Sequence, residues 1–83
     1  MVVQTVSVRP FLVVQDGIKY EFLPAEEGGY VVRVPAAKGC WSEGDSFEEA
    51  LDNIKDALEA WVEVAKEKGF SLPPKLAGVS GLR

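Results

Sequence analysis

Residues 46–69 read SFEEALDNIKDALEAWVEVAKEKG, and this stretch decides the fold. Ser46 followed three residues later by Glu49 is a capping box, in which each side chain satisfies a backbone N–H near the start of a helix. Gly69 is typical of a helix end, and lysines in the last turn suit the negative end of the helix dipole. Between these ends, apolar residues recur at helical spacing and form one stripe: Phe47, Ala50, Leu51, Ile54, Ala57, Leu58, Trp61, Val62 and Ala65. The pattern predicts one long amphipathic helix with its apolar side on a sheet.

The residues before this helix have the alternation of antiparallel strands. Apolar and polar side chains alternate most clearly over 18–22, and a second alternating run covers 30–34. The segment between them contains proline and two adjacent glycines, which is turn chemistry, so the two runs predict a hairpin. Cys40 and Trp41 are expected on a third strand, which Gly44 closes.

The two ends of the chain extend this core. The valine-rich segment 1–14 predicts an additional N-terminal strand, followed by a turn at Asp16-Gly17. Pro73-Pro74 prevents the long helix from continuing, and residues 75–83 are expected to form a short strand or a loose tail. The expected fold is therefore a single α+β domain over 1–83, with its core at 18–74 and one helix covering a small antiparallel sheet.

Composition excludes several classes of protein. With one cysteine and no histidine among 83 residues, the chain cannot form an internal disulfide, and a tetrahedral zinc site is close to excluded. A formal net charge of −4 without a basic stripe disfavours direct nucleic-acid binding. The apolar start lacks the features of a signal peptide or a membrane span, and a lone cysteine suits a reducing compartment. These features predict a cytoplasmic protein that contacts no membrane.

The small size of the domain favours self-association. A chain of 83 residues buries a thin core, and such domains commonly gain stability from disulfides, metals or partner subunits. Because a disulfide is excluded and a zinc site is close to excluded, we expect a homo-oligomer, either a dimer or a tetramer.

The net charge is concentrated on the predicted helix. Residues 46–68 contain seven acids and three lysines, which leaves −4, whereas the rest of the chain balances six acids against six basic residues. The acids that fall outside the apolar stripe therefore form one strongly negative helix face. Such a face is often only a solvated surface, but it also suits the attraction of a basic partner.

The order of these elements and several short motifs together resemble the HicB-like antitoxin family. The resemblance covers residues 18–74. The residues that carry it are small, capping or apolar residues at fixed offsets around one helix start: Pro35, Gly39-Cys40, Gly44-Asp45-Ser46, Glu49-Ala50-Leu51, Asn53, Ala57-Leu58 and Leu72-Pro73-Pro74. The resemblance implies a partial RNase H-like fold. Because the sequence shows no legible catalytic site, we also expect no enzymatic activity. The resemblance also implies a HicA-like partner, a small basic RNA-cleaving toxin that the family binds and silences.

The sequence departs from that family in one respect. Full-length members carry a C-terminal DNA-binding domain, and the nine residues after Pro74 are too few for one. We therefore expect no direct DNA binding.

Candidate binding residues come from the helix face and the third strand. Tryptophan is enriched at binding hot spots, so Trp41 is a candidate partner anchor. The other candidates are the acids along the outer helix face: Asp52, Asp56, Glu59 and Glu63. The sequence offers no catalytic, cofactor-binding or metal-ligating set.

Three other interpretations stay open at this level. The domain could be a self-associating structural or regulatory module without a toxin partner. Glu43 and Asp45 could serve a metal-dependent nuclease, which would need further carboxylates from other elements. Cys40 could be a redox thiol, although a small packed residue is the more common role.

Overall fold

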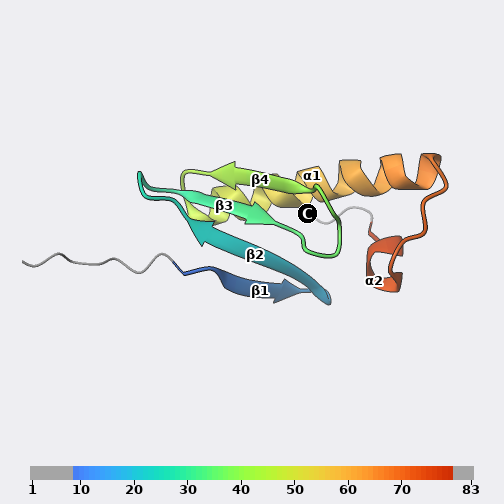
Figure 1. Cartoon of the computed structure of the whole chain (residues 1–83), viewed down its shortest axis with the longest axis horizontal. Helices are drawn as coiled ribbons and strands as arrows, with labels where there is room; N and C mark the ends of the chain where they lie inside the picture. Colours follow the sequence, from blue (N-terminus) through green and yellow to red (C-terminus); the bar gives the residue numbers. More distant parts are fainter. Residues whose placement is uncertain (1–8, 80–83) are drawn as a thin grey trace, which may run out of the picture.

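The computed structural model describes residues 9–79. In chain order the elements are β1 (Phe11–Gln15), β2 (Ile18–Pro24), β3 (Tyr30–Arg33), β4 (Trp41–Gly44), α1 (Phe47–Glu67) and α2 (Pro74–Ala77). The strands form one antiparallel sheet in the order β1-β2-β3-β4, and α1 packs against β4 and β3 (Figure 1). The predicted α+β class, a small antiparallel sheet covered by one long helix, is confirmed.

A two-residue turn joins β1 to β2. Gln15 pairs with Ile18, and between them Asp16 and Gly17 have φ angles of 53° and 77°. Two successive left-handed residues make a type I′ turn, whose twist matches that of the flanking strands. The turn lies where the sequence predicted it. Residues 1–8 of the additional strand expected over 1–14 lie outside the described residues.

The central hairpin and the strand after it follow the predicted alternation. Phe22 pairs with Val32 in the β2–β3 register, and Val32 pairs with Ser42 in the β3–β4 register. The third predicted strand is β4, which starts at Trp41. Cys40 instead closes the preceding loop, because its carbonyl accepts the N–H of Val34 at 3.1 Å.

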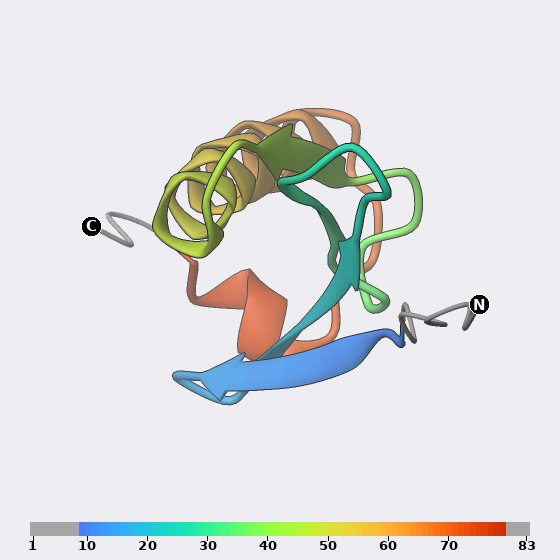
Figure 2. The ribbon, with the colours of Figure 1, turned by 90° about the vertical axis from the view of Figure 1, so that its left-hand side faces the viewer.

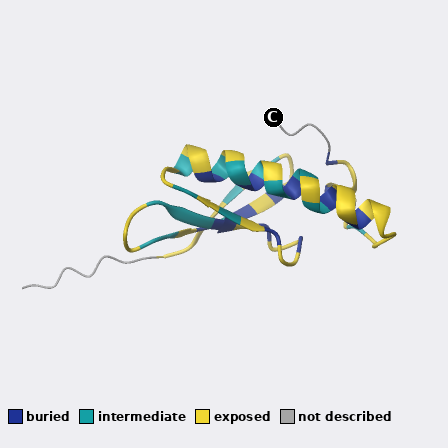
Figure 3. Ribbon diagram, turned by 90° about the horizontal axis from the view of Figure 1, so that it is seen from above, coloured by how far each residue is buried: buried dark blue, intermediate teal, exposed yellow. Residues whose placement is uncertain are grey.

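The core lies between one face of the sheet and α1, where the buried residues concentrate (Figure 3). Ile18, Tyr20, Phe22 and Val32 contribute from the sheet and are at most 4% exposed. Phe47 adds an aromatic contact, with its ring centroid 4.7 Å from that of Phe22. The helix contributes residues spaced three or four apart, as the apolar stripe predicted: Ala50, Ile54, Leu58, Val62 and Ala65.

The start of α1 is capped on two backbone N–H groups. The Ser46 hydroxyl accepts the N–H of Glu49 at 3.0 Å, which places the helix start where the sequence predicted it. The Glu49 carboxylate accepts the N–H of Asp45 at 2.5 Å. It therefore reaches one residue further back than in the usual capping box, where it binds the N-cap residue itself.

The segment after α1 differs from the expected strand or loose tail. Pro74 starts the short helix α2, because proline needs no N–H partner at a first helical position and its φ is already helical. Leu76 is 1% exposed and Val79 is 6% exposed, so both residues belong to the core. Figure 2 shows the sheet curling around this space, with α2 between the β1–β2 hairpin and α1. Residues 80–83 lie outside the described residues.

None of the helices in residues 9–79 is long and apolar enough to cross a membrane.

Candidate protein-binding groove

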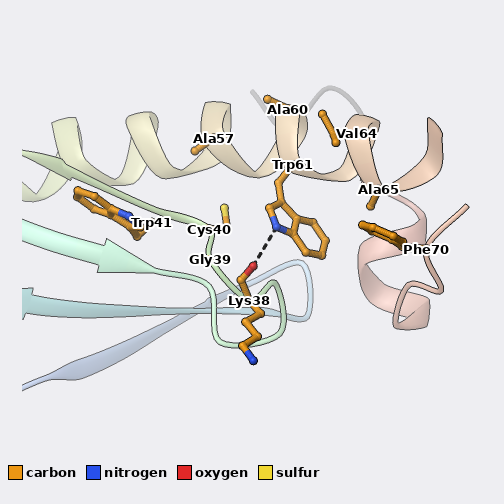
Figure 4. A pocket seen from close by; sticks show the side chains of 10 residues that line it. All are labelled: Lys38, Gly39, Cys40, Trp41, Ala57, Ala60, Trp61, Val64, Ala65 and Phe70. Atoms are coloured by element: carbon orange, nitrogen blue, oxygen red, sulfur yellow. Dashed lines mark hydrogen bonds between the residues drawn. The ribbon is translucent and has the colours of Figure 1, made fainter. Parts of the chain in front are cut away.

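A groove of about 670 Å³ separates the loop before β4 from the C-terminal half of α1 (Figure 4). The loop and the first residue of β4 form one bank, α1 forms the floor and the other bank, and Phe70 closes one end. Small residues keep the groove open on the helix side, since Ala57 and Ala60 face it where larger side chains would fill it. Apart from Lys38, every lining residue is apolar or glycine. The groove can therefore bury apolar side chains of another molecule.

A hydrogen bond fixes the two banks relative to each other. The indole N–H of Trp61 donates to the carbonyl oxygen of Lys38 at 3.1 Å (Figure 4). This bond holds the loop before β4 against α1, while the rest of the Trp61 ring lines the groove. The sequence predicted Trp61 as a core residue. In the structure it is half-buried and shared between the core and the groove.

The end of α1 determines where Phe70 lies. Gly69 has a φ of 74°, so the chain leaves the helix in a left-handed conformation that favours glycine. The N–H of Phe70 donates to the carbonyl of Ala65 at 2.9 Å, and that of Gly69 donates to Lys66 at 3.1 Å. These two bonds are the Schellman motif, and they turn the chain back so that Phe70 lines the groove.

Three large apolar side chains around the groove are open to solvent. Trp41 is 59% exposed, Val64 is 47% exposed and Phe70 is 59% exposed. Contiguous exposed apolar surface is uncommon on monomeric proteins and usually marks an interaction site. Aromatic anchors in a groove are also typical of the energetically dominant centre of an interface.

The predicted acidic residues lie in one row beside this groove. Spacings of four, three and four residues place their side chains on the same side of the helix, away from the sheet. Glu59 is half-buried and the other three acids are exposed: Asp52, Asp56 and Glu63. The exposed residues Ala60 and Val64 follow next around the helix, between the acidic row and the groove. The groove thus has an apolar interior with a negative margin.

The structure places the predicted Trp41 on the bank opposite this acidic row. Sequence analysis missed Val64 and Phe70. Val64 lies four residues after Ala60, and this pair extends the apolar surface of α1 beyond the core stripe. That extension was the available signal for Val64. The position of Phe70 in the groove depends on how the chain turns at Gly69. The sequence indicated only that the helix ends there.

Cys40 contributes a neutral thiol to the loop bank of the groove. It is 5% exposed, and burial raises its pKa to about 11. The reactive form of cysteine is the thiolate, so the thiol behaves as a small packing group at neutral pH.

The carboxylates considered for a nuclease do not gather into a metal site. Within the described part of the chain, no three histidine, cysteine, aspartate or glutamate side chains lie where they could hold a metal ion together. Among residues 9–79, Glu43 and Asp45 therefore have no third ligand of the kind on which that alternative depends.

Comparison with known proteins gives a family match over most of the chain. The model of the family described as HicB-like antitoxin of bacterial toxin–antitoxin systems matches residues 20–81. No solved structure matches the chain significantly.

Relatives of similar size occur in archaea and bacteria. A UPF0150 protein of Thermoplasma acidophilum is 46% identical over 48 residues, which cover 58% of this chain and 70% of the relative. A UPF0150 protein of Synechocystis is 32% identical over 60 residues, or 72% of this chain and 82% of the relative. A UPF0150 protein of Helicobacter pylori is 54% identical over 37 residues, or 45% of this chain and 51% of the relative.

Proposed function

Because the chain belongs to the HicB-like antitoxin family, we propose that it binds and masks a small, basic, RNA-cleaving toxin of the HicA-like type. The observation that best supports this proposal is the apolar groove with its acidic margin. An interface of this kind needs an apolar centre for affinity and complementary charge around it for orientation and encounter.

The groove supplies the apolar centre. Trp41 and Phe70 stand at opposite ends of it, with Trp61 between them (Figure 4), and both are largely exposed. A partner that lays apolar side chains along the groove would therefore remove both rings from water. Burying a large apolar side chain contributes about 1.5–3 kcal/mol. Two such anchors could therefore carry much of the affinity of a small complex.

The acidic row supplies the complementary charge. An RNA-cleaving protein must hold phosphates on a positively charged surface, and carboxylates presented in a row compete for the same surface. Masking by this route is binding alone, so the chain needs no catalytic residue. The proposal includes no enzymatic activity for this chain.

The same charge argues against direct contact with DNA. Affinity for duplex DNA depends on basic residues that displace counterions from phosphates, and the formal net charge of the chain is −4. We expect no salt-sensitive shift of duplex DNA in a gel at submicromolar protein. A shift that disappears as salt is raised would contradict this part of the proposal.

The direct test is capture of the partner from an extract of the source organism, followed by an RNA-cleavage assay. We expect a small basic protein that cleaves RNA when alone and loses that activity as this protein is added in stoichiometric amounts. A captured partner that does not cleave RNA, or that cleaves it equally fast in the complex, would reject toxin masking.

The role of the groove can be tested on the same complex. We expect Trp41→Ala and Phe70→Ala each to weaken binding about 30-fold, since loss of a hot-spot aromatic costs about 2 kcal/mol. Leu23→Ala is the matched control, because Leu23 is 43% exposed and does not line the groove. Equal effects of all three substitutions on the dissociation constant would remove the groove from the interface.

A further inference from the structure

Among residues 9–79, the outer edge of β1 is a free margin of the sheet. β1 lies at the end of the strand order, on the far side of the curved sheet from α1 (Figures 1 and 2). Within residues 9–79, β2 is the one strand that pairs with it. Unpaired strand edges are templates for pairing with another chain, and proteins commonly cover them or place charges on them.

The side chains of β1 give this edge no such protection. Leu12 is 56% exposed and Val14 is 59% exposed, and both point to the sheet face away from α1. β1 contains no charged residue. A five-residue edge strand with apolar exposed side chains is therefore open to a partner strand.

The backbone of the same two residues points outward. In a hairpin with a two-residue turn, the residues flanking the turn form a hydrogen-bonded pair, and bonded and non-bonded pairs then alternate. Gln15 with Ile18 is that flanking pair here, so Val13 with Tyr20 is bonded and the pairs at Leu12 and Val14 are not. The N–H and C=O groups of Leu12 and Val14 therefore face away from β2.

The opposite edge of the sheet is protected. β4 lies directly against α1, and the side-chain amide of Asn53 donates to the carbonyl oxygen of Glu43 at 2.8 Å. This bond occupies an acceptor that an added strand would need. The two margins thus differ, and β1 is the one available for strand addition.

We propose that β1 pairs antiparallel with β1 of a second copy of this chain, around a twofold axis at Val13. In this register, Leu12 lies opposite Val14 of the second copy, and Val14 lies opposite its Leu12. The two residues exchange N–H···O bonds in each pair, so four new bonds would satisfy all outward groups of both residues. The result is one continuous eight-stranded sheet with both grooves left open, because the grooves lie beside α1 on the other margin.

Charge complementarity favours a second copy over an unrelated strand. The same register places Pro10 opposite Asp16 of the second copy, so the exposed Arg9 comes beside that carboxylate, and the symmetric pair repeats the contact. Within β1, no two like charges face each other across the axis, because its paired residues are all uncharged. Opposite charges near the ends of an otherwise apolar pair of strands favour one register of the two strands. They also favour a second copy of β1 over an unrelated strand.

The first experiment measures mass by light scattering at micromolar to 100 micromolar protein. We expect twice the chain mass for the natural protein and the single-chain mass for the Leu12→Lys/Val14→Lys variant. Leu23→Lys is the control, because Leu23 is exposed on the central strand β2, and this variant should keep the dimer mass. Circular dichroism should show the same fold for all three proteins. A monomeric natural protein, or a dimeric Leu12→Lys/Val14→Lys variant, would overturn the proposal.

The second experiment tests the register without weakening the edge. In a Cys40→Ala background, Val13→Cys should form a disulfide between copies on mild oxidation, because residues opposite each other at a non-bonded pair have Cα atoms about 4.5 Å apart. Leu12→Cys should stay unlinked, since the two copies of residue 12 are displaced along the strands beyond the roughly 7 Å limit. Failure of the Val13→Cys link in a protein of dimer mass would overturn this register.

Discussion

Gly44 lets α1 lie directly on the sheet. A Cβ atom at this position would stand 2.4 Å from the amide nitrogen of Ala50 and 2.8 Å from its Cα. Backbone atoms of a helix cannot move away individually, so any side chain at position 44 must push α1 from β4. The Asn53 bond to the Glu43 carbonyl depends on this close approach.

We therefore expect Gly44→Ala to lower the free energy of unfolding by about 3 kcal/mol, at the upper end of what overpacking costs. Gly78→Ala is the matched control, because nothing lies within 4 Å of a Cβ added there and its φ is −93°. Urea melts should show less than about 0.5 kcal/mol of change for the control. Equal midpoints for the natural protein and Gly44→Ala would mean that α1 does not approach β4 this closely.

The buried thiol of Cys40 makes stability depend on pH in the alkaline range. Its pKa is raised from an ordinary 9.0 to about 11 by burial, so the unfolded chain loses this proton at lower pH than the folded chain. The contribution is constant below about pH 9, and the free energy of unfolding falls as pH rises from 9 toward 11.

Cys40→Ala should accordingly show a smaller fall in the free energy of unfolding between pH 8 and 10 than the natural protein, by about 1 kcal/mol. The comparison uses the change in the free energy of unfolding with pH within each protein. The loss of packing caused by the substitution is the same at both pH values and therefore cancels. The pKa of Tyr20 is raised by burial, by Asp16 and by Cys40. Loss of Cys40 therefore also lowers the pKa of Tyr20 in the folded state, which reduces the alkaline fall in the same direction. Identical pH dependence would show that the Cys40 thiol ionises in the folded state as readily as in the unfolded chain.

The cap at Ser46 determines where α1 begins. Its hydroxyl satisfies the Glu49 N–H, and the Glu49 carboxylate binds the preceding backbone. Ser46→Ala should lower the free energy of unfolding by about 1 kcal/mol, the usual loss of an N-cap hydroxyl. Ser71→Ala is the control, because Ser71 is exposed in the segment after the helix. Overlapping urea melts of the natural protein and Ser46→Ala would place the helix start elsewhere.

The elements that the sequence predicted correctly are those with local rules. Ser46, Gly69 and the apolar spacing between them define α1 without reference to the rest of the chain. The alternation around Tyr20 and Val32 likewise defines the central hairpin. α2 was missed because a four-residue helix has no periodicity of its own, and it depends on burying Leu76 in a space that the curved sheet creates.

The groove is formed by contacts between residues far apart in the chain, which a sequence pattern does not predict. Trp41 was predicted as a binding residue from its residue type, and the acidic row was predicted from its charge. That Trp41 and the acidic row lie on either side of one groove depends on the Trp61 bond to the Lys38 carbonyl, between residues 23 positions apart. Ala60 and Val64 lie between the row and the groove. Val64 and Phe70 are exposed because the loop before β4 does not extend over them. The position of that loop relative to α1 does not follow from the local sequence. Sequence reasoning therefore identified candidate residues, and the tertiary structure joined them into a surface.

The placement of the acids on this surface leads to a prediction about association with the proposed basic partner. Attraction between an acidic row and a basic surface raises the encounter rate, and salt screens it. We expect Asp52→Lys/Glu63→Lys to slow association by about tenfold at low salt and to flatten its salt dependence. Both residues are exposed, whereas Asp56 and Glu59 have further interactions within the chain and are left unchanged.

The matched control is Glu26→Lys/Glu27→Lys, which makes the same change in net charge on the exposed β2–β3 turn, outside the groove. If the position of the row matters, stopped-flow rates at two salt concentrations should change much less for this control. A control that slows association as much as the helix variant would show that net charge alone governs the encounter. Unchanged rates in both variants would leave the apolar groove as the sole basis of recognition, and the acids of α1 would then be a solvated face.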